Sequence, residues 1–371
     1  MSGVEDCSRA DRLAGDLDGL ELDALLVESL VDVRYLTGFS GSNGAAVIFS
    51  QRLASEFGPH RFYTDFRYVT QSAAQVPDCF ARETLSGEML EGIFAGLDGA
   101  GGRLGFDESS ITVKGHRRML ELLPDRWELA PCSGAVAKLR AVKDAGEIAS
   151  MRAASELADE ALKSVLEDGL AGRSEREVAI ELELRMRRLG AQSASFPSIV
   201  ASGEHGALPH AEPRDQTIPR DVLVTIDWGA YHEGYCSDCT RTYATGEGIP
   251  ALATEVYELV LRAQLSGLDA VKVGASGRQI DAIAREVIEQ AGHGEHFGHG
   301  LGHGVGLEIH EPPRLSKTAP EDPLLIGNVV TVEPGVYVPG VLGVRIEDLV
   351  AVGAEAQEVL TSLPKELTVI S

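Results

Sequence analysis

The sequence predicts an α/β domain followed by an α+β domain with an internal pseudo-repeat, and three observations lead to this prediction. The chain has 371 residues, about two and a half times the ~150 residues of a typical domain. Over roughly the first third of the chain, short β-like runs alternate with helical stretches. Two acidic, hairpin-like segments of similar sequence then follow one another in the second part of the chain.

The composition is that of an ordinary globular protein, and it excludes several functional classes. Apolar residues make up 44% of the chain and charged residues 24%, which argues against disordered and fibrous proteins. The net charge of −24 repels phosphate backbones and anionic lipid, so we expect neither nucleic acid nor a membrane as partner. The chain shows no run of about 18 apolar residues and no signal peptide, and the five scattered cysteines predict reduced thiols. We therefore expect a soluble, cytoplasmic protein.

The β-like runs of the first domain are short and rich in β-branched and aromatic residues, and they lie at 25–27, 45–49, 61–63 and 103–106. After Cys132 the sequence becomes small and basic, and a long amphipathic helix then begins near Ile148. We place the domain boundary near residue 138, which gives domains of residues 1–137 and 138–371.

Two capping boxes mark the starts of further helices in the second domain. Ser174 with Glu177 opens a helix that stops at Gly190. Ser276 with Gln279 opens another, which ends before a glycine at position 292.

The internal repeat consists of two β-branched runs that each deliver a carboxylate just before a glycine. Segment 221–229 (DVLVTIDWG) delivers Asp227, and segment 327–335 (GNVVTVEPG) delivers Glu333. A second acid follows on the next extended run, and these acids are Asp238 and Glu347. Any one of these acids could be an ordinary turn residue, but four in two matched hairpins indicate carboxylates that face one another.

Histidines concentrate in the same part of the chain, because five of the ten lie between His293 and His310. Glycines alternate with other residues through this stretch, which favours an extended backbone and excludes a dinucleotide loop that leads into a helix. We interpret His293 and His296 as ordinary surface or core histidines. His303 and His310 are the better candidates for chemistry.

Four carboxylates and one imidazole form an oxygen-rich set that suits Mn²⁺, Co²⁺, Fe²⁺ or Zn²⁺. Two divalent ions would balance the four charges, activate a water molecule and polarise a carbonyl, which makes amide hydrolysis the expected reaction. The pair Cys236 and Cys239 resembles a zinc or redox motif, but no second pair exists. Asp238, which lies between the two cysteines, is the stronger ligand candidate.

The motifs TIDWG, SDCTRT, GHGVG, VEPG and RIED resemble those of the pita-bread metallopeptidases, specifically the Xaa-Pro aminopeptidases and Xaa-Pro dipeptidases. The segment DALLVESLVDVRYLTGFSGSNG is similar to their creatinase-type N-terminal domain. The resemblance implies a catalytic domain with a pseudo-twofold repeat. It also implies five metal ligands, which are Asp227, Asp238, His303, Glu333 and Glu347, with Asp238 and Glu347 bridging two ions.

The resemblance assigns further roles around these ligands. Glu333 would act as general base, while His210 and His310 would bind substrate and stabilise the tetrahedral state. His299 would lie near the substrate subsites. Arg345 would orient Glu347 by a charge-assisted contact, although a solvated hairpin arginine is the alternative.

By the same resemblance, the substrates are peptides with proline in the second position. The resemblance also implies two divalent ions as cofactors, with Mn²⁺ favoured and Co²⁺ and Zn²⁺ as the alternatives. We favour an Xaa-Pro aminopeptidase. The alternative is an Xaa-Pro dipeptidase, in which Arg314 would bind the free carboxylate of the dipeptide. A binding module without catalysis is disfavoured because all five ligand positions are intact. A homodimer is expected by resemblance only, and Cys239 is a candidate for thiol oxidation.

Overall fold

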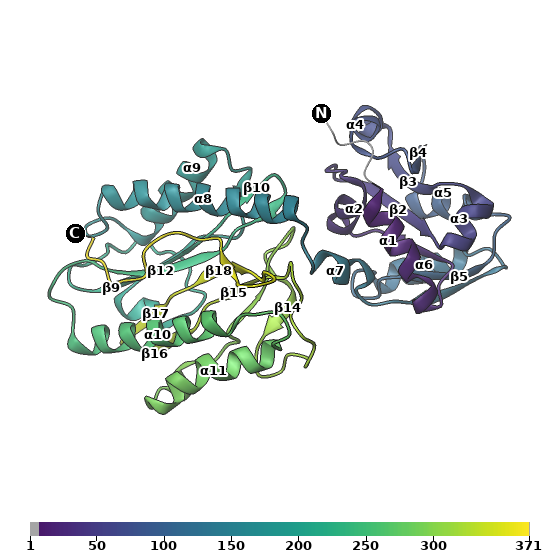
Figure 1. Ribbon diagram of the computed structural model, residues 1–371. Helices are drawn as coiled ribbons and strands as arrows, with labels where there is room; N and C mark the ends of the chain where they lie inside the picture. Colours follow the sequence, from purple (N-terminus) through teal and green to yellow (C-terminus); the bar gives the residue numbers. More distant parts are fainter. Residues whose placement is uncertain (1–6, 371) are drawn as a thin grey trace. The chain divides into compact units, whose positions relative to one another are not determined.

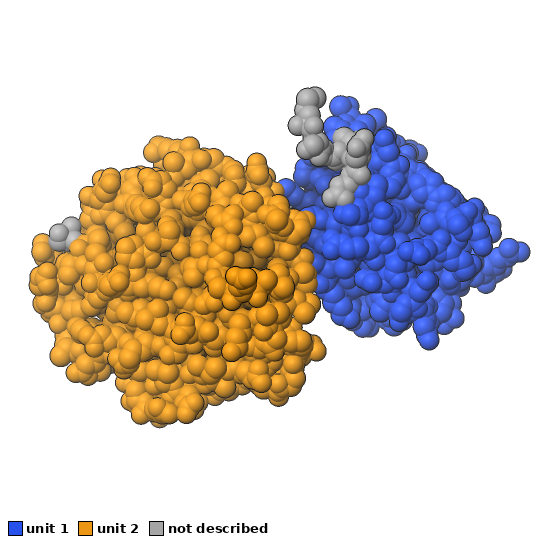
Figure 2. Space-filling view, in the orientation of Figure 1, with its two compact units in different colours: residues 1–140 blue, residues 141–371 orange. Residues whose placement is uncertain are grey.

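A computed structural model describes residues 7–370, and the chain divides into two compact units, 1–140 and 141–371 (Figure 2). The boundary that we placed near residue 138 falls inside a short helix, α7 (Ala135–Arg140). Within the first unit, the buried Arg140 at the end of this helix donates to Asp32 at 2.8 Å. Only the first part of the small and basic stretch, residues 135–140, therefore forms a helix that belongs to the first unit.

The first unit is an α/β domain, as predicted, built on one mixed sheet in the order β4-β3-β2-β1-β5-β6 (Figure 1). Its strands are β1 (Ala24–Val27), β2 (Gly44–Phe49), β3 (His60–Asp65), β4 (Phe80–Leu85), β5 (Gly102–Phe106) and β6 (Trp127–Pro131). Its other helices are α1 (Ser8–Asp16), α2 (Leu30–Thr37), α3 (Gln51–Phe57), α4 (Val69–Gln75), α5 (Met89–Ala95) and α6 (Val113–Leu122). The unit has a core of its own, which includes Leu104 and Trp127.

One prediction about the cysteines is wrong. Cys7 and Cys79, which lie 72 residues apart in sequence, form a disulfide in the first unit. The spacing of the cysteines gave no sign of this pair, because the fold of the unit brings the start of β4 near the start of α1. Cys132, Cys236 and Cys239 form no disulfide within residues 7–370.

The second unit is an α+β domain in which two helix pairs pack against antiparallel strands. The helices are α8 (Ala145–Glu167), α9 (Glu175–Leu189), α10 (Ala251–Ala270) and α11 (Gly277–Gln290). The capping boxes predicted at Ser174 and Ser276 are confirmed at the starts of α9 and α11. In Figure 1 the pair α8 and α9 lies on one side of the strands, and the pair α10 and α11 lies on the other.

The predicted repeat is confirmed by the strand pairing. In the first half, β9 (Leu223–Trp228) pairs antiparallel with β12 (Cys239–Ala244), and a small hairpin, β10 (Ala230–His232) and β11 (Tyr235–Cys236), is inserted between them. In the second half, β15 (Val329–Val332) pairs antiparallel with β18 (Asp348–Ala351) around the hairpin of β16 (Gly335–Val338) and β17 (Leu342–Arg345). Each half buries an apolar cluster under its own helix pair.

Shorter strands complete the second unit: β7 (Ser193–Ala194), β8 (Ile199–Ser202), β13 (Gly302–Gly304), β14 (Glu311–Leu315) and β19 (Glu358–Val359). The extended backbone expected for the glycine-rich stretch is confirmed only for residues 302–304, which form β13. Among the described helices, none is both long enough and apolar enough to cross a membrane.

Candidate metal centre

Equivalent positions of the two halves supply the four acids. Asp227 lies at the end of β9, and Glu333 directly follows β15. Asp238 directly precedes β12, and Glu347 directly precedes β18, so each occupies the break between two strands. Because the paired strands run antiparallel, the end of one lies beside the start of the other, and each pair brings its two acids together.

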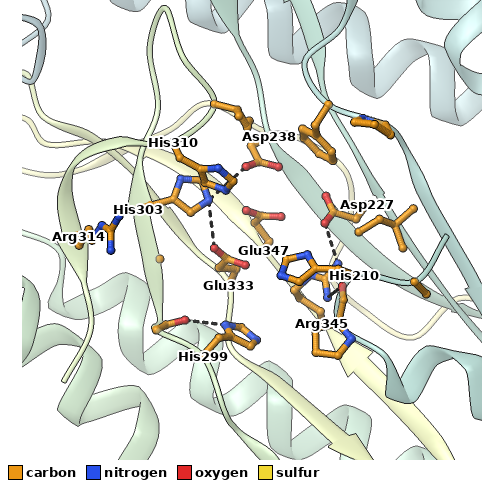
Figure 3. Close-up of a pocket in the computed structure, with 18 of the residues that line it drawn as sticks. His210, Asp227, Asp238, His299, His303, His310, Arg314, Glu333, Arg345 and Glu347 are labelled. Carbon is orange, nitrogen blue, oxygen red and sulfur yellow. Dashed lines mark hydrogen bonds and ion pairs between the residues drawn. The ribbon is translucent and has the colours of Figure 1, made fainter. Parts of the chain in front are cut away.

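The carboxylates converge on one cavity of about 770 Å³ in the second unit (Figure 3). One oxygen each from Asp227, Asp238 and Glu347 lie within 4.8 Å of one another. The Nε2 atom of His303, on β13, lies 3.6 Å from Asp238 Oδ2 and 3.3 Å from Glu333 Oε1. All five residues expected to bind metal therefore surround one space.

The charges of this cluster are poorly compensated by the protein. Burial, reinforced by the neighbouring carboxylates, raises the pKa of Asp238 and of Glu347 well above the usual range. Burial also raises the pKa of Glu333. Burial lowers the pKa of His303, which favours the neutral imidazole that can donate a lone pair to a cation. Bound cations would offset the desolvation and the mutual repulsion of these carboxylates and so favour their ionised form.

The donor set fits divalent metal ions. Within residues 7–370, the buried Asp227 Oδ1 atom has no hydrogen-bond partner, and leaving such an atom unpaired costs about 1–3 kcal/mol. Carboxylate oxygens with a single imidazole suit Mn²⁺ and related ions, whereas a structural zinc site would use thiolate ligands. The thiols of Cys236 and Cys239 do not line the cavity.

Arg345 forms a different ion pair from the one that we expected. Its Nη2 atom donates to Asp227 Oδ2 at 2.7 Å, and its Nε atom donates to Thr240 Oγ1 at 3.0 Å. The Thr240 hydroxyl in turn donates to Glu347 Oε2 at 2.7 Å. Arg345 also donates to the Tyr337 hydroxyl at 2.9 Å. One buried guanidinium therefore orients Asp227 directly and Glu347 through Thr240.

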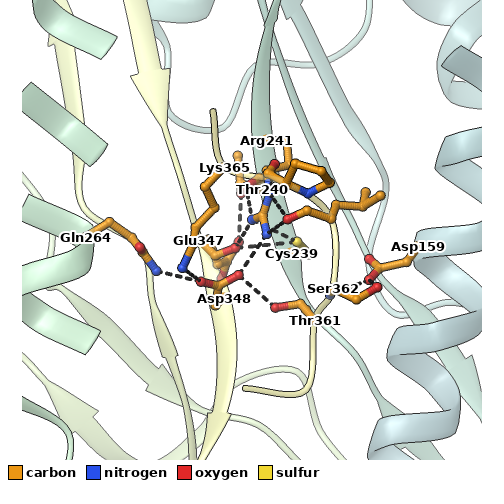
Figure 4. A network of polar contacts seen from close by, with 12 residues as sticks. Asp159, Cys239, Thr240, Arg241, Gln264, Glu347, Asp348, Thr361, Ser362 and Lys365 are labelled. Atoms are coloured by element: carbon orange, nitrogen blue, oxygen red, sulfur yellow. Dashed lines mark hydrogen bonds and ion pairs between the residues drawn. The ribbon is translucent and has the colours of Figure 1, made fainter. Parts of the chain in front are cut away.

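A buried network lies behind Glu347 (Figure 4). Arg241, which is 1% exposed, donates to the main-chain oxygen of Glu347 and, at 2.8 Å, to Asp348 Oδ1. Lys365 and Gln264 donate to the other oxygen of Asp348 at 2.7 and 2.8 Å. This network fixes the backbone that presents the Glu347 carboxylate.

Cys239 takes part in the same arrangement, because its thiol donates to the main-chain oxygen of Glu347 at 3.4 Å. Burial raises the pKa of Cys239 well above its usual range. A buried, protonated thiol is a poor target for oxidants, so its surroundings argue against the thiol oxidation that we considered from the sequence.

Three histidines and one arginine expected to contact substrate line the same cavity, and they are His210, His299, His310 and Arg314. The ring of His310 lies 4.3 Å from that of His303 between centroids. The Nε2 atom of His299 lies 2.9 Å from the Tyr337 hydroxyl. Burial lowers the pKa of both His299 and His310, so both are held neutral near pH 7.

His293 and His296 do not line the cavity, and their Nδ1 atoms lie 3.0 Å from each other. The sequence did not single out Thr240, Arg241 or Tyr337. The signal for Arg241 was present but slight: a charged residue stands inside a strand whose other residues are all suited to burial.

Comparison with known proteins agrees with this geometry. Residues 149–354 match the model of metallopeptidase family M24, and residues 9–142 match the creatinase/prolidase N-terminal domain. An Xaa-Pro dipeptidase of Pyrococcus horikoshii is 35% identical over 352 residues, which are 95% of this chain and 96% of that protein.

Two solved structures of similar proteins share the whole architecture. An Xaa-Pro dipeptidase from Bacillus anthracis has a TM-score of 0.92 at 40% identity, covering 97% of this chain and 99% of that one. An X-Pro aminopeptidase from Thermotoga maritima has a TM-score of 0.87 at 33% identity, covering 98% and 100%. The chain therefore belongs to metallopeptidase family M24, and it combines a creatinase-type N-terminal domain with a pita-bread catalytic domain.

Proposed function

We propose that the protein is an Xaa-Pro dipeptidase that hydrolyses the bond before a C-terminal proline. The observation that carries this proposal is the position of Arg314. Its side chain lines the cavity, and it lies opposite His303 in the pairing of β13 with β14. Among the described residues, no carboxylate forms an ion pair with the Arg314 guanidinium. A planar guanidinium beside the candidate metal ligands is suited to bind the free carboxylate of a dipeptide.

The candidate ligands would hold two divalent ions, and Mn²⁺ is our first choice for an oxygen-rich set. Asp238 and Glu347, which occupy the same place in the two halves of the repeat, would hold these ions. Asp227, His303 and Glu333 complete the set. When bound, such ions lower the pKa of water and polarise a carbonyl group.

The chain's own residues would manage the protons and orient the substrate. We assign Glu333 as the base that accepts the proton of the attacking water. His310, whose pKa is lowered by burial, and His210 also line the cavity, where an imidazole N–H can donate to the developing oxyanion or to the departing proline nitrogen. Such proton transfers contribute about 10²–10⁴-fold. His299, held by Tyr337, would shape the subsite for the first residue.

An Xaa-Pro aminopeptidase is the second candidate, and the size of the cavity favours it. A volume of about 770 Å³ lies within the range of about 300–1,000 Å³ that encloses drug-sized ligands, so a residue after proline has room. The similar protein from Thermotoga maritima carries that activity in its name.

The deciding experiment compares Xaa-Pro, Xaa-Pro-NH₂ and Xaa-Pro-Yaa as substrates with Mn²⁺, Co²⁺ and Zn²⁺ in turn. A dipeptidase cleaves the free dipeptide and loses most activity on the amide. Arg314→Met should then raise KM for Xaa-Pro by about 10- to 100-fold, the equivalent of a lost charge-assisted contact of about 1.5–3 kcal/mol. Arg152→Met, which removes an exposed guanidinium paired with Glu358 in the same unit, serves as the matched control. Equal cleavage of dipeptide and tripeptide, unaffected by Arg314→Met, would identify the aminopeptidase.

A further inference from the structure

The loop that carries His210, residues 203–213, forms one wall of the cavity, and we call it the His210 loop. Five consecutive residues of this loop, 209–213, line the cavity. The loop begins after β8 with a short helix, η3 (Gly203–Ala207), and lies against β17 so closely that a Cβ on Gly343 would meet the Gly206 oxygen at 1.8 Å. The position of His210 therefore depends on what holds this loop.

Both ends of the His210 loop converge on one buried carboxylate, Glu175, the first residue of α9. Before the loop, the backbone N–H and the hydroxyl of Ser202 each donate to Glu175 Oε1 at 2.8 Å. After the loop, Arg214 donates through its backbone N–H and through two guanidinium nitrogens, each at 3.1 Å. Within the loop, His205 Nδ1 lies 2.9 Å from Glu175 Oε2.

The Glu175 side chain is 0% exposed, so its charge depends on these donors. Burial alone would raise the pKa of Glu175, but the hydrogen bonds from Arg214 and Ser202 outweigh it and lower the pKa to about 2. The N-terminus of α9 also favours a negative charge at this position. Lifting the loop would remove donors from a buried carboxylate, which is strongly unfavourable.

We propose that Glu175 is a positioning residue that holds the His210 loop in the conformation that binds substrate. The inference rests on the proposed function only for the role of His210. A second contact, from Arg345 Nη1 to the Pro209 oxygen at 3.2 Å, ties the cavity side of the same loop to the guanidinium that orients Asp227. Glu175 thus holds the two ends of the His210 loop, and Arg345 holds the part of the loop that lies beside the candidate metal ligands.

The variant for the test is Arg214→Met, which keeps the apolar stem but removes the guanidinium, and whose side chain is 38% exposed. The matched control is Arg176→Met. The Arg176 guanidinium pairs with Asp215 at 2.9 Å, so it joins the same two segments from outside without touching Glu175. Amide hydrogen exchange of the Mn²⁺-loaded protein should become at least tenfold faster across 203–213 in Arg214→Met. In Arg176→Met it should stay within twofold of the wild type.

A double-mutant cycle with His210→Ala connects the loop to catalysis. We expect Arg214→Met to lower kcat/KM on the cleaved Xaa-Pro substrate by about 10- to 100-fold, since a shift of about 1 Å in a positioned group can cost ~10²-fold. Combined with His210→Ala, it should lower kcat/KM by no more than about twofold further. The amount of Mn²⁺ bound should stay the same in every variant.

Several results would overturn the proposal. Multiplicative effects in the cycle, or faster exchange spread over the whole unit, would mean that Arg214 and Glu175 act through general stability. Unchanged kcat/KM in His210→Ala would remove the link to substrate. By contrast, a wild-type protein that binds Mn²⁺ but cleaves no Xaa-Pro substrate would contradict the proposed function, while the exchange data would still decide whether Glu175 holds the loop.

Discussion

Buried glutamates behave in two opposite ways in this protein, and the difference lies in their donors. Glu175 accepts hydrogen bonds from Ser202 and Arg214 inside the fold, and its pKa falls to about 2. Burial and neighbouring acids raise the pKa of Glu347, which accepts from Thr240. The first carboxylate is satisfied by the protein itself, whereas the second lies in a cluster that only a cation can complete.

This contrast predicts how stability depends on pH at Glu175. Because the pKa of Glu175 in the folded protein, about 2, lies below the usual glutamate value of 4.5, the ionised group stabilises the fold above about pH 5. This contribution is lost as the pH falls toward 2. The shift corresponds to about 3 kcal/mol. Urea unfolding should therefore show that Glu175→Gln is about 3 kcal/mol less stable than the wild type at pH 7. Near pH 3 this difference should be about half as large.

The control for this measurement is Glu177→Gln, two residues along the same helix, where the capping contact with Ser174 survives the change. Its difference from the wild type should be small. A Glu175→Gln deficit that stays constant from pH 7 to pH 3 would contradict the ionised state of Glu175.

At the scale of elements, β12 and β18 form the rigid support of the centre. Arg241 on β12 and Asp348 on β18 are each 1% exposed and paired at 2.8 Å. Removing one partner of such a pair leaves an uncompensated buried charge, so Arg241→Met should destabilise the second unit by about 3–5 kcal/mol. Because Arg241 also holds the backbone of Glu347, Mn²⁺ affinity measured by calorimetry should fall by about 10- to 100-fold.

Arg152→Met is the matched control, since Arg152 and Glu358 form an exposed pair in the same unit that should contribute at most about 1 kcal/mol. If Arg241→Met lost stability but bound Mn²⁺ as tightly as the wild type, the support of Glu347 by Arg241 would be wrong.

The elements also show what could be predicted from the sequence. The strands that carry Asp227 and Glu333 were predictable, because β-branched runs and a terminal carboxylate are local signals. The ion pair of Arg345 with Asp227 was not, because it depends on how β17 lies against β9, which no local pattern encodes. The same holds for Cys7 with Cys79, and for Glu175, whose partners lie up to 39 residues away.

At the scale of the whole molecule, the two units have separate apolar cores and separate optical probes. The chain contains two tryptophans, and Trp127 is buried in the first unit while Trp228 is buried in the second. The candidate ligands all belong to the second unit, so we expect a bound ion to stabilise that unit. In the Trp127→Phe variant, tryptophan fluorescence reports on the second unit alone. In the Trp228→Phe variant, it reports on the first unit alone.

Metal should therefore stabilise one unit and not the other. Free Mn²⁺ at 100 times its Kd adds about 2.7 kcal/mol to the state that binds it, which corresponds to roughly 5–10 °C for a unit of this size. We expect this rise in the melting temperature of the transition reported by Trp228, and a chelator should reverse it. In protein whose Mn²⁺ content has been verified, the transition reported by Trp127 should shift by less than about 2 °C. Adding Asp238→Asn should abolish the rise, because the substitution removes one charge from a cluster that needs cations. Equal shifts at both tryptophans, or a full shift in the Asp238→Asn protein, would place the stabilising ion outside this centre.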